Sequence, residues 1–361
     1  MNKKIEDIVS EVKKVVIGKD EIIEKVLMAI LAGGHILLED VPGVGKTTLA
    51  LTFSKVLGLD YKRMQFTPDS VPSDITGFSV YNKNSGEFQY MEGCAMTNLL
   101  LADEINRASS KTQSALLEVM EEGKITVDGV TRTVEKPFVV IATQNPTGWI
   151  GTQSLPNSQL DRFMIRLNMG YPDMNNLIEI MKDRHHENPL DKVKHVINKN
   201  ELINLQELAG NIYVSDEIYE YISKLVEKTR EHELIKLGIS PRGALAICKM
   251  AKAKAMLGGR DYVVPQDVQY IFKDVCSHRI IVESRSMINE VNTDEIMKEI
   301  IESVENEKKE LRIFFTAVII SDISSSVAAE IIFNNSYNYD FDRNTYICLC
   351  KISNYEFKCR A

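Results

Sequence analysis

The sequence predicts an α/β domain, with a parallel sheet between helices, followed by a smaller all-helical domain. Short apolar runs that suit buried parallel strands alternate with helical patterns; the runs lie at 36–38, 99–102 and 138–142, and the helical patterns at 47–57 and 111–122. Such alternation is typical of a sheet that is covered on both faces. After about Tyr171-Pro172 the strand pattern stops, and apolar residues recur at helical spacing to about Ser303.

Composition limits the classes of function. The chain has 361 residues, of which 44% are hydrophobic, and this is enough for one large domain or two ordinary ones. Its net charge of −8 argues against broad binding to nucleic-acid phosphates. The start is charged, so we expect no signal peptide, and no stretch reaches the roughly 18 apolar residues that a membrane helix needs. Cys94, Cys248 and Cys276 are scattered, which predicts reduced thiols and a cytoplasmic protein.

These observations divide the chain into four expected parts: the α/β domain at 1–170, a connection at 171–194, the helical domain at 195–306 and a tail at 307–361. Near the start, Asp20 is placed to cap a helix that Gly33-Gly34 ends. The tail combines an apolar run with many Asn and Tyr residues and half of the six cysteines. We assign it no role; an added partner-binding segment, a disordered end and a shifted reading frame all stay open.

A glycine-rich segment follows the first predicted strand and opens a helix. It reads Asp40, Val41, Pro42, Gly43, Val44, Gly45, Lys46, Thr47 and Thr48. This is the context of a phosphate-binding P-loop, in which glycines let backbone N–H groups turn inward and the helix N-terminus adds a positive dipole end. We expect Lys46 to reach the β- and γ-phosphates and the Thr47 hydroxyl to bind Mg²⁺. The usual pattern begins with Gly, so Asp40 is a departure.

Polar residues end the two other predicted strands. Asp103 and Glu104 follow the strand at 99–102, and Asn145 follows the strand at 138–142. The carboxyl ends of parallel strands are where α/β sheets bind ligands. We expect Asp103 to hold Mg²⁺ and Glu104 to act as general base on the attacking water, while Asn145 bonds that water or the γ-phosphate. Alone, each would be an ordinary polar turn; the P-loop upstream favours a nucleotide site.

Six motifs in this order resemble the MoxR family of AAA+ ATPases, over about residues 5–303. They are the segments at 37–47, 98–108, 111–118 and 141–146, then Leu160-Asp161-Arg162-Phe163 and Gly238-Ile239-Ser240-Pro241-Arg242-Gly243. The resemblance implies a P-loop AAA+ core with a helical lid. MoxR proteins also accept Asp at the first P-loop position, which accommodates Asp40.

The resemblance implies further site residues. Val16, Ile17 and Gly18 match the segment that packs on adenine, although Lys19 stands where the family usually has Gln. Two predicted hairpins, at 78–91 and 125–131, match elements that face the pore of the ring in such proteins.

Three side chains take the family's catalytic roles by resemblance. Asn145 matches the sensor 1 residue, and Arg162 matches the arginine finger that reaches a neighbour's γ-phosphate. Arg242 matches the sensor 2 arginine. Whether Arg242 acts within its own subunit or on the next one stays open.

The resemblance implies an ATPase that uses ATP and Mg²⁺ and works as a homo-oligomeric ring, expected to be a hexamer. MoxR-like proteins act on protein partners as chaperone-like remodelling machines, and such partners often carry a von Willebrand factor A domain. Two other functions stay open: a nucleotide-gated binding switch with little turnover, and a nucleic-acid-dependent motor, against which the acidic charge speaks. The client and the ring size are not given by the sequence.

Overall fold

The computed structural model describes residues 2–145, 155–183, 189–283 and 293–305. The chain divides into two compact units, 1–297 and 298–361, and all of the elements named below lie in the first unit. Of the second unit, only the helical stretch 298–305 is described, so the expected tail at 307–361 lies outside the described residues.

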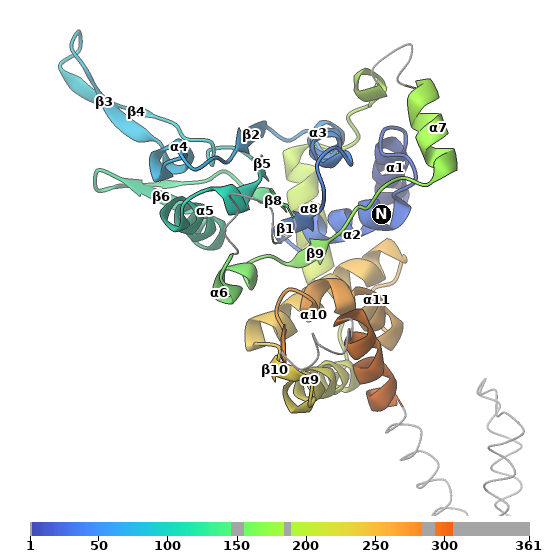
Figure 1. Ribbon diagram of the computed structural model, residues 1–361. Coiled ribbons are helices and arrows are strands. Elements are labelled where there is room, and N and C mark those ends of the chain that lie inside the picture. Colours follow the sequence, from blue (N-terminus) through green and yellow to red (C-terminus); the bar gives the residue numbers. More distant parts are fainter. Residues whose placement is uncertain (1, 146–154, 184–188, 284–292, 306–361) are drawn as a thin grey trace, which may run out of the picture. The chain divides into compact units, whose positions relative to one another are not determined.

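A five-stranded parallel sheet forms the centre of the first unit (Figure 1). The strand order is β2-β5-β8-β1-β9, with β1 at Ile36–Glu39, β2 at Tyr61–Gln65, β5 at Leu99–Asp103, β8 at Val139–Gln144 and β9 at Ile165–Leu167. Every residue of β5 and β8 is buried, which explains their nearly continuous apolar sequences. The carboxyl ends of β1, β5 and β8 meet at one edge of the sheet, because the three strands pair in parallel.

Helices cover both faces of this sheet. Those of the α/β part are α1 at Asn2–Lys13, α2 at Asp20–Leu31, α3 at Lys46–Val56, α4 at Pro72–Thr76, the short 3₁₀ helix η1 at Ile105–Arg107, α5 at Ser110–Glu122 and α6 at Asn157–Leu160. Leu116, Leu117 and Met120 of α5 pack with alternate strand residues such as Leu100 and Val140. The intervening strand residues are equally buried and point to the other face, so the sheet is a two-sided core.

The prediction that Asp20 caps a helix was wrong by one residue. Lys19 occupies the N-cap position of α2 and makes no side-chain cap bond, while Asp20 is the first helical residue. Its carboxylate instead lies 3.0 Å from the Lys13 ammonium. A carboxylate in the first turn still interacts favourably with the helix dipole.

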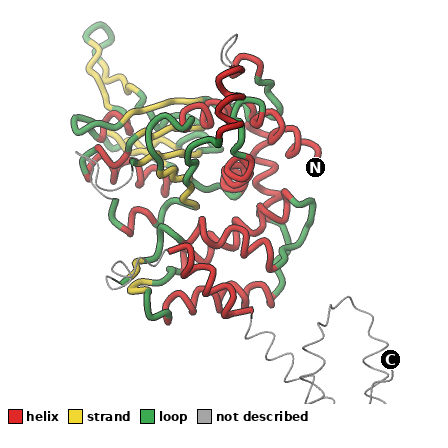
Figure 2. Tube along the Cα trace, turned by 45° about the vertical axis from the view of Figure 1, so that its right-hand side comes forward, coloured by secondary structure: helices red, strands yellow, loops and turns green. Residues whose placement is uncertain are grey.

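Both predicted hairpins are present, each as a two-stranded antiparallel sheet. Strands β3 at Phe78–Asn82 and β4 at Glu87–Met91 form one, and β6 at Lys124–Val127 and β7 at Val130–Thr133 form the other. The turn of the second has positive φ at Asp128 and Gly129, which suits a two-residue hairpin. Figures 1 and 2 show β3–β4 extending beyond the central sheet.

The remaining described elements are mainly helical: α7 at Met174–Asp183, η2 at Pro189–Lys192, α8 at Lys199–Gly210, α9 at Asp216–Glu231, α10 at Pro241–Leu257 and α11 at Pro265–Cys276. A short antiparallel pair that the sequence did not predict, β10 at Ile235–Leu237 and β11 at Ile281–Val282, joins them. The α/β part with its parallel sheet and the helical part that follows confirm the predicted fold class. None of the helices in the described ranges has the length and apolarity to cross a membrane.

Candidate functional site

The glycine-rich loop lies between the carboxyl end of β1 and the start of α3. Gly43 and Gly45 have φ values of 87° and 99°, a left-handed conformation that strains other residues, and Gly45 is the N-cap of α3. Lys46 is the first residue of that helix, is 8% exposed, and donates from Nζ to the Asp40 carbonyl at 2.7 Å. Thr47 and Thr48 follow in the first helical turn and are half-buried. The loop therefore has the backbone that a phosphate cradle needs.

Asp40 fixes the beginning of this loop. Its side chain is buried, and Oδ1 accepts from the Val41 backbone N–H at 2.9 Å while Oδ2 accepts from the Gly170 N–H at 2.7 Å. Charged acceptors make the stronger class of hydrogen bond. The departure from Gly at this position thus has a structural reason: the carboxylate ties the phosphate loop to the chain that follows β9.

Three carboxylates act electrostatically on the Lys46 ammonium. Burial lowers the pKa of Lys46, and the negative charges of Asp40, Asp103 and Glu104 act in the opposite direction. Lys46, Asp103 and Glu104 are thus brought together, as predicted from the strand ends. Two of these carboxylates also have a cation of their own, because Arg63 pairs with Asp103 and Arg107 pairs with Glu104.

Thr143, on β8, bridges the two acids that follow β5. Its fully buried hydroxyl donates to Asp103 Oδ1 at 2.6 Å and accepts from the Glu104 backbone N–H at 2.9 Å. The other carboxylate oxygen of Asp103 accepts from Arg63 Nη2 at 2.7 Å. Asp103 is therefore oriented from both sides.

Glu104 has a left-handed backbone, with φ 57° and ψ 46°. Its Oε1 accepts from Asn145 Nδ2 at 3.2 Å, and its Oε2 accepts from Arg107 Nη1 at 2.9 Å. Burial acts to raise the pKa of Glu104, but these hydrogen bonds outweigh it and the pKa lies below its ordinary value. The side chain is thus an ionised carboxylate at neutral pH.

Asn145 is held at the end of β8 by Asn106. The Asn106 amide donates to the Asn145 carbonyl at 3.1 Å and accepts from its backbone N–H at 3.4 Å, and both residues are buried. The side chain of Asn145 is left to reach Glu104. Pro146, the next residue of the predicted motif, lies outside the described residues.

The chemistry of this oxygen set suits Mg²⁺. A hydroxyl from Thr47 and one carboxylate from Asp103 are hard oxygen donors, and magnesium in such sites takes its remaining ligands from phosphate and water. No cluster of three or more His, Cys, Asp or Glu side chains that could hold a metal occurs within the described ranges.

Four further residues shape this site although the sequence predicted no role for them: Arg63, Asn106, Arg107 and Thr143. Asn106 and Arg107 stand directly after the predicted acids, so their position was a usable signal. Arg63 and Thr143 act through strand neighbours about 40 positions away along the chain. Only the pairing of β2, β5 and β8 reveals them.

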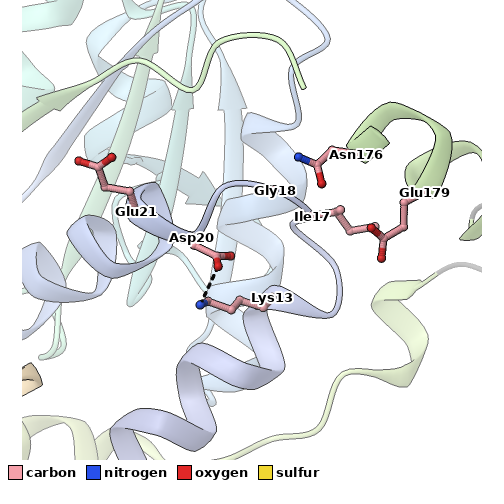
Figure 3. Close-up of a pocket in the computed structure, with 7 residues that line it drawn as sticks. All are labelled: Lys13, Ile17, Gly18, Asp20, Glu21, Asn176 and Glu179. Carbon is pink, nitrogen blue, oxygen red and sulfur yellow. Dashed lines mark ion pairs between the residues drawn. The ribbon is translucent and has the colours of Figure 1, made fainter. Parts of the chain in front are cut away.

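A surface pocket lies beside the segment predicted to contact adenine. Its cavity of about 560 Å³ is lined by Lys13, Ile17, Gly18, Asp20, Glu21, Asn176 and Glu179 (Figure 3). Val16, the first residue of this segment, is buried. Gly18 has φ 70°, a conformation that strains other residues, and a Cβ there would lie 2.2 Å from Asn176 Nδ2, so a larger residue would also displace the Asn176 side chain.

The pocket is connected to the phosphate loop through the chain between β9 and α7. Lys19 donates from Nζ to the Tyr171 carbonyl at 3.0 Å, and the preceding residue, Gly170, is the donor to Asp40. A side chain at Gly45 would approach Met169 to 3.9 Å. Val16, Ile17 and Gly18 are thereby fixed beside the nucleotide loop.

Arg162 and Arg242 lie elsewhere. Arg162 Nη1 donates to the Leu117 carbonyl at 3.3 Å and to Glu121 Oε2, and Arg242 Nη2 donates to Glu121 Oε1. Glu121 is in the last turn of α5, at the end of the sheet opposite the phosphate loop. The structure therefore brings the two predicted arginines to each other, through one carboxylate, and not to Lys46.

The sequence and the fold are similar to those of known proteins. The family model "ATPase family associated with various cellular activities (AAA)" matches residues 35–165, and the AAA lid domain model matches 227–300. YeaC of Bacillus subtilis is 47% identical over 82% of this chain and 92% of its own length. The chaperone MoxR1 of Mycobacterium tuberculosis is 38% identical over 83% of this chain and 81% of its own length.

A crystal structure of a Cytophaga hutchinsonii protein has the same fold. It superposes with a TM-score of 0.79 at 37% identity, covering 83% of this chain and 94% of the other. The AAA and lid models match the α/β and helical parts in that order, and MoxR1 aligns over most of both chains. The chain therefore belongs to the MoxR family of AAA+ ATPases.

Proposed function

We propose that this protein binds ATP with Mg²⁺, hydrolyses it, and uses the hydrolysis to remodel or activate protein partners. Membership of the AAA+ ATPases supports the first two steps, and the chaperone name of MoxR1 supports the third. The observation that carries the proposal is the convergence of Lys46, Asp103 and Glu104 beside a left-handed glycine loop.

Each residue of the site has a proposed role in hydrolysis. Lys46 pairs with the β- and γ-phosphates, while Thr47 and Asp103 hold the metal ion, Asp103 through water. When bound, Mg²⁺ neutralises phosphate charge. Glu104 takes a proton from the attacking water, and Asn145 orients that water or the γ-phosphate. The backbone N–H groups of the loop at 41–48 surround the phosphates, with Asp40 holding the first turn.

The pocket beside Val16, Ile17 and Gly18 is proposed to receive the adenine base. Ile17 offers an apolar wall, and Asn176 and Glu179 of α7 offer polar groups from the opposite side (Figure 3). The remaining lining includes the charged side chains of Lys13, Asp20 and Glu21, so the support for an adenine role is the match of residues 16–18 to the family's adenine-contacting segment.

The active form is proposed to be a homo-oligomeric ring, expected to be a hexamer, in which Arg162 reaches the γ-phosphate bound by a neighbour. Its position away from its own phosphate loop supports an action between subunits. Arg242 contributes to the same reaction. The protein partners are proposed to carry a von Willebrand factor A domain. The chain is proposed to be cytoplasmic and to divide into an α/β domain at 1–170, a connection at 171–194, a helical domain at 195–306 and a tail at 307–361. Binding to nucleic acid is not expected, given the net charge of −8.

Two substitutions test the ATPase. Lys46→Ala should abolish Mg²⁺-dependent ATP binding in calorimetry, whereas Lys55→Ala, at a half-exposed position on the same helix, should bind normally. Glu104→Gln should still bind ATP but lose roughly 10²–10⁴ in turnover, as expected for a general base. If ATP hydrolysis and partner activation both survive in Glu104→Gln, the proposed hydrolysis-driven remodelling through Glu104 is wrong. If hydrolysis is lost and partner activation survives, a binding switch is the better description. A pull-down with this variant and ATP would identify the client.

A further inference from the structure

Arg162 and Arg242 share one carboxylate although they come from different parts of the fold. Arg162 follows α6 in the α/β part, and Arg242 is the second residue of α10 in the helical part. Each oxygen of Glu121 accepts from one of the two guanidinium groups. The three side chains are 32%, 44% and 34% exposed, so the group is open at the surface.

The topology places this group at the amino end of the sheet. His35, just before β1, donates from Nε2 to the carbonyl of Met120, the residue before Glu121. The His35 carbonyl accepts from the N–H of Met164, the residue just before β9. The phosphate loop begins at the other end of β1, about 13 Å away for a strand of four residues. The arginine pair is thus separated by the length of β1 from the nucleotide site of its own chain.

A partly buried network fixes the backbones of the two arginines relative to each other. Asp161, next to Arg162, accepts from Arg279 Nε at 2.8 Å and from the Ser240 hydroxyl at 3.0 Å. Ser240 is the N-cap of α10 and so sets the position of Arg242. The backbones at Arg162 and Arg242 are therefore held close together, and the positions of the two guanidinium groups depend on their contacts with Glu121.

We propose that Glu121 is a positioning residue that holds Arg162 and Arg242 side by side as one anion site, which receives the terminal phosphate of ATP bound by a neighbouring copy of this chain. Without a carboxylate between them, two guanidinium groups repel and separate. With it, both are aligned before an oxyanion arrives, and a phosphate has the several acceptor oxygens that two guanidinium groups can share. The inference rests on the proposed ATPase function and places both arginines in the site of the neighbour.

The first test compares Glu121→Gln with Glu122→Gln in the full-length assembled protein. The amide can accept from one guanidinium group only, so the other loses its partner. The kcat for ATP hydrolysis should fall about 10- to 100-fold, the effect of displacing a group near the reacting atoms, with the KM for ATP unchanged. Glu122→Gln removes the same charge at the adjacent exposed position and should keep the wild-type kcat. An unchanged or higher kcat in Glu121→Gln, or a change in KM alone, overturns the proposal.

The second test assigns the effect to one subunit. Lys46→Ala subunits keep both arginines, Arg162→Ala subunits keep an intact nucleotide site, and mixing them should restore ATP hydrolysis. Adding Glu121→Gln to the Lys46→Ala subunits should remove most of the restored activity, whereas adding it to the Arg162→Ala subunits should not. An equal loss in both mixtures indicates a general structural defect and overturns the positioning role. If the mixture of Lys46→Ala and Arg162→Ala subunits without Glu121→Gln restores no activity, Arg162 does not act between subunits as proposed, and the role of Glu121 is then refuted as well.

Discussion

Replacing Thr143 by Val removes the hydroxyl that connects the two acids of the site and keeps the shape of the side chain. Two hydrogen bonds are lost: the bond to the Asp103 carboxylate at 2.6 Å and the bond from the Glu104 N–H at 2.9 Å. A bond to a charged group contributes about 1.5–3 kcal/mol, and an unpaired buried N–H costs about 1–3 kcal/mol. The added methyl group returns about 0.8 kcal/mol by apolar burial. We expect Thr143→Val to lower the free energy of unfolding by about 2–5 kcal/mol.

The matched control is Thr143→Ser, which keeps the hydroxyl and loses one fully buried methyl group. It should cost about 1 kcal/mol. Urea unfolding followed by circular dichroism measures both variants, and steady-state ATP hydrolysis should fall in Thr143→Val but not in Thr143→Ser, because Asp103 and the Glu104 backbone are released only in the first. If the Val variant is as stable and active as the Ser variant, Thr143 does not connect the acids and the description of the site is wrong.

Three further predictions concern other polar contacts. Burial lowers the pKa of His35 to about 4 from its ordinary value of 6.5. As the pH falls from 6.5 to about 4, the unfolded chain takes up a proton that the folded chain does not, and the free energy of unfolding falls by up to about 3 kcal/mol. His35→Gln can still donate to Met120 and accept from Val140. Its free energy of unfolding, measured by urea titration, should therefore change less between high and low pH than that of the wild type, and an equal change in both proteins would refute this. Asp40→Gly restores the usual P-loop residue but loses the bonds that hold the loop, so calorimetry should show about tenfold weaker ATP binding, and an unchanged Kd would contradict the assigned role. Arg107→Ala removes a hydrogen bond that lowers the pKa of Glu104, so the acid limb of the pH–kcat profile should move to higher pH, and a limb that stays in place would exclude Glu104 as the titrating base.

Burial decided which strands the sequence could predict. Strands β5 and β8 are buried at every position and read as unmistakable apolar runs. β2, at the edge of the sheet, is partly exposed throughout, and its sequence Tyr-Lys-Arg-Met-Gln carries no such run. β9, β10 and β11 have three residues or fewer, which is too short for any periodicity to appear.

Only some residues of the candidate site could be predicted from the sequence. Asp103, Glu104 and Asn145 could be predicted because they end or directly follow apolar strands, and Lys46 because it closes the glycine-rich loop after β1. The parallel strands bring these carboxyl ends together. Glu121 could not be predicted, because it is one of several acidic residues near the end of a helix. Its meaning comes from contacts with Arg162 and Arg242, which are 41 and 121 positions away along the chain.

Helix α5 connects the two ends of the sheet at which these groups lie. In its first turn, Gln113 Nε2 donates to the Ile105 carbonyl at 3.1 Å, which fixes the helix to η1 and to Asn106, the residue that holds Asn145. Glu121 lies eight residues later, about 12 Å along the helix axis. A helix interior transmits displacement because its hydrogen bonds leave little freedom between turns. If Asn145 follows the loss of the γ-phosphate, α5 would carry that movement to the carboxylate that aligns the arginine pair. ATP hydrolysis in one subunit would then change the alignment of its own Arg162 and Arg242, which act on the neighbouring subunit, and no separate signalling element would be needed.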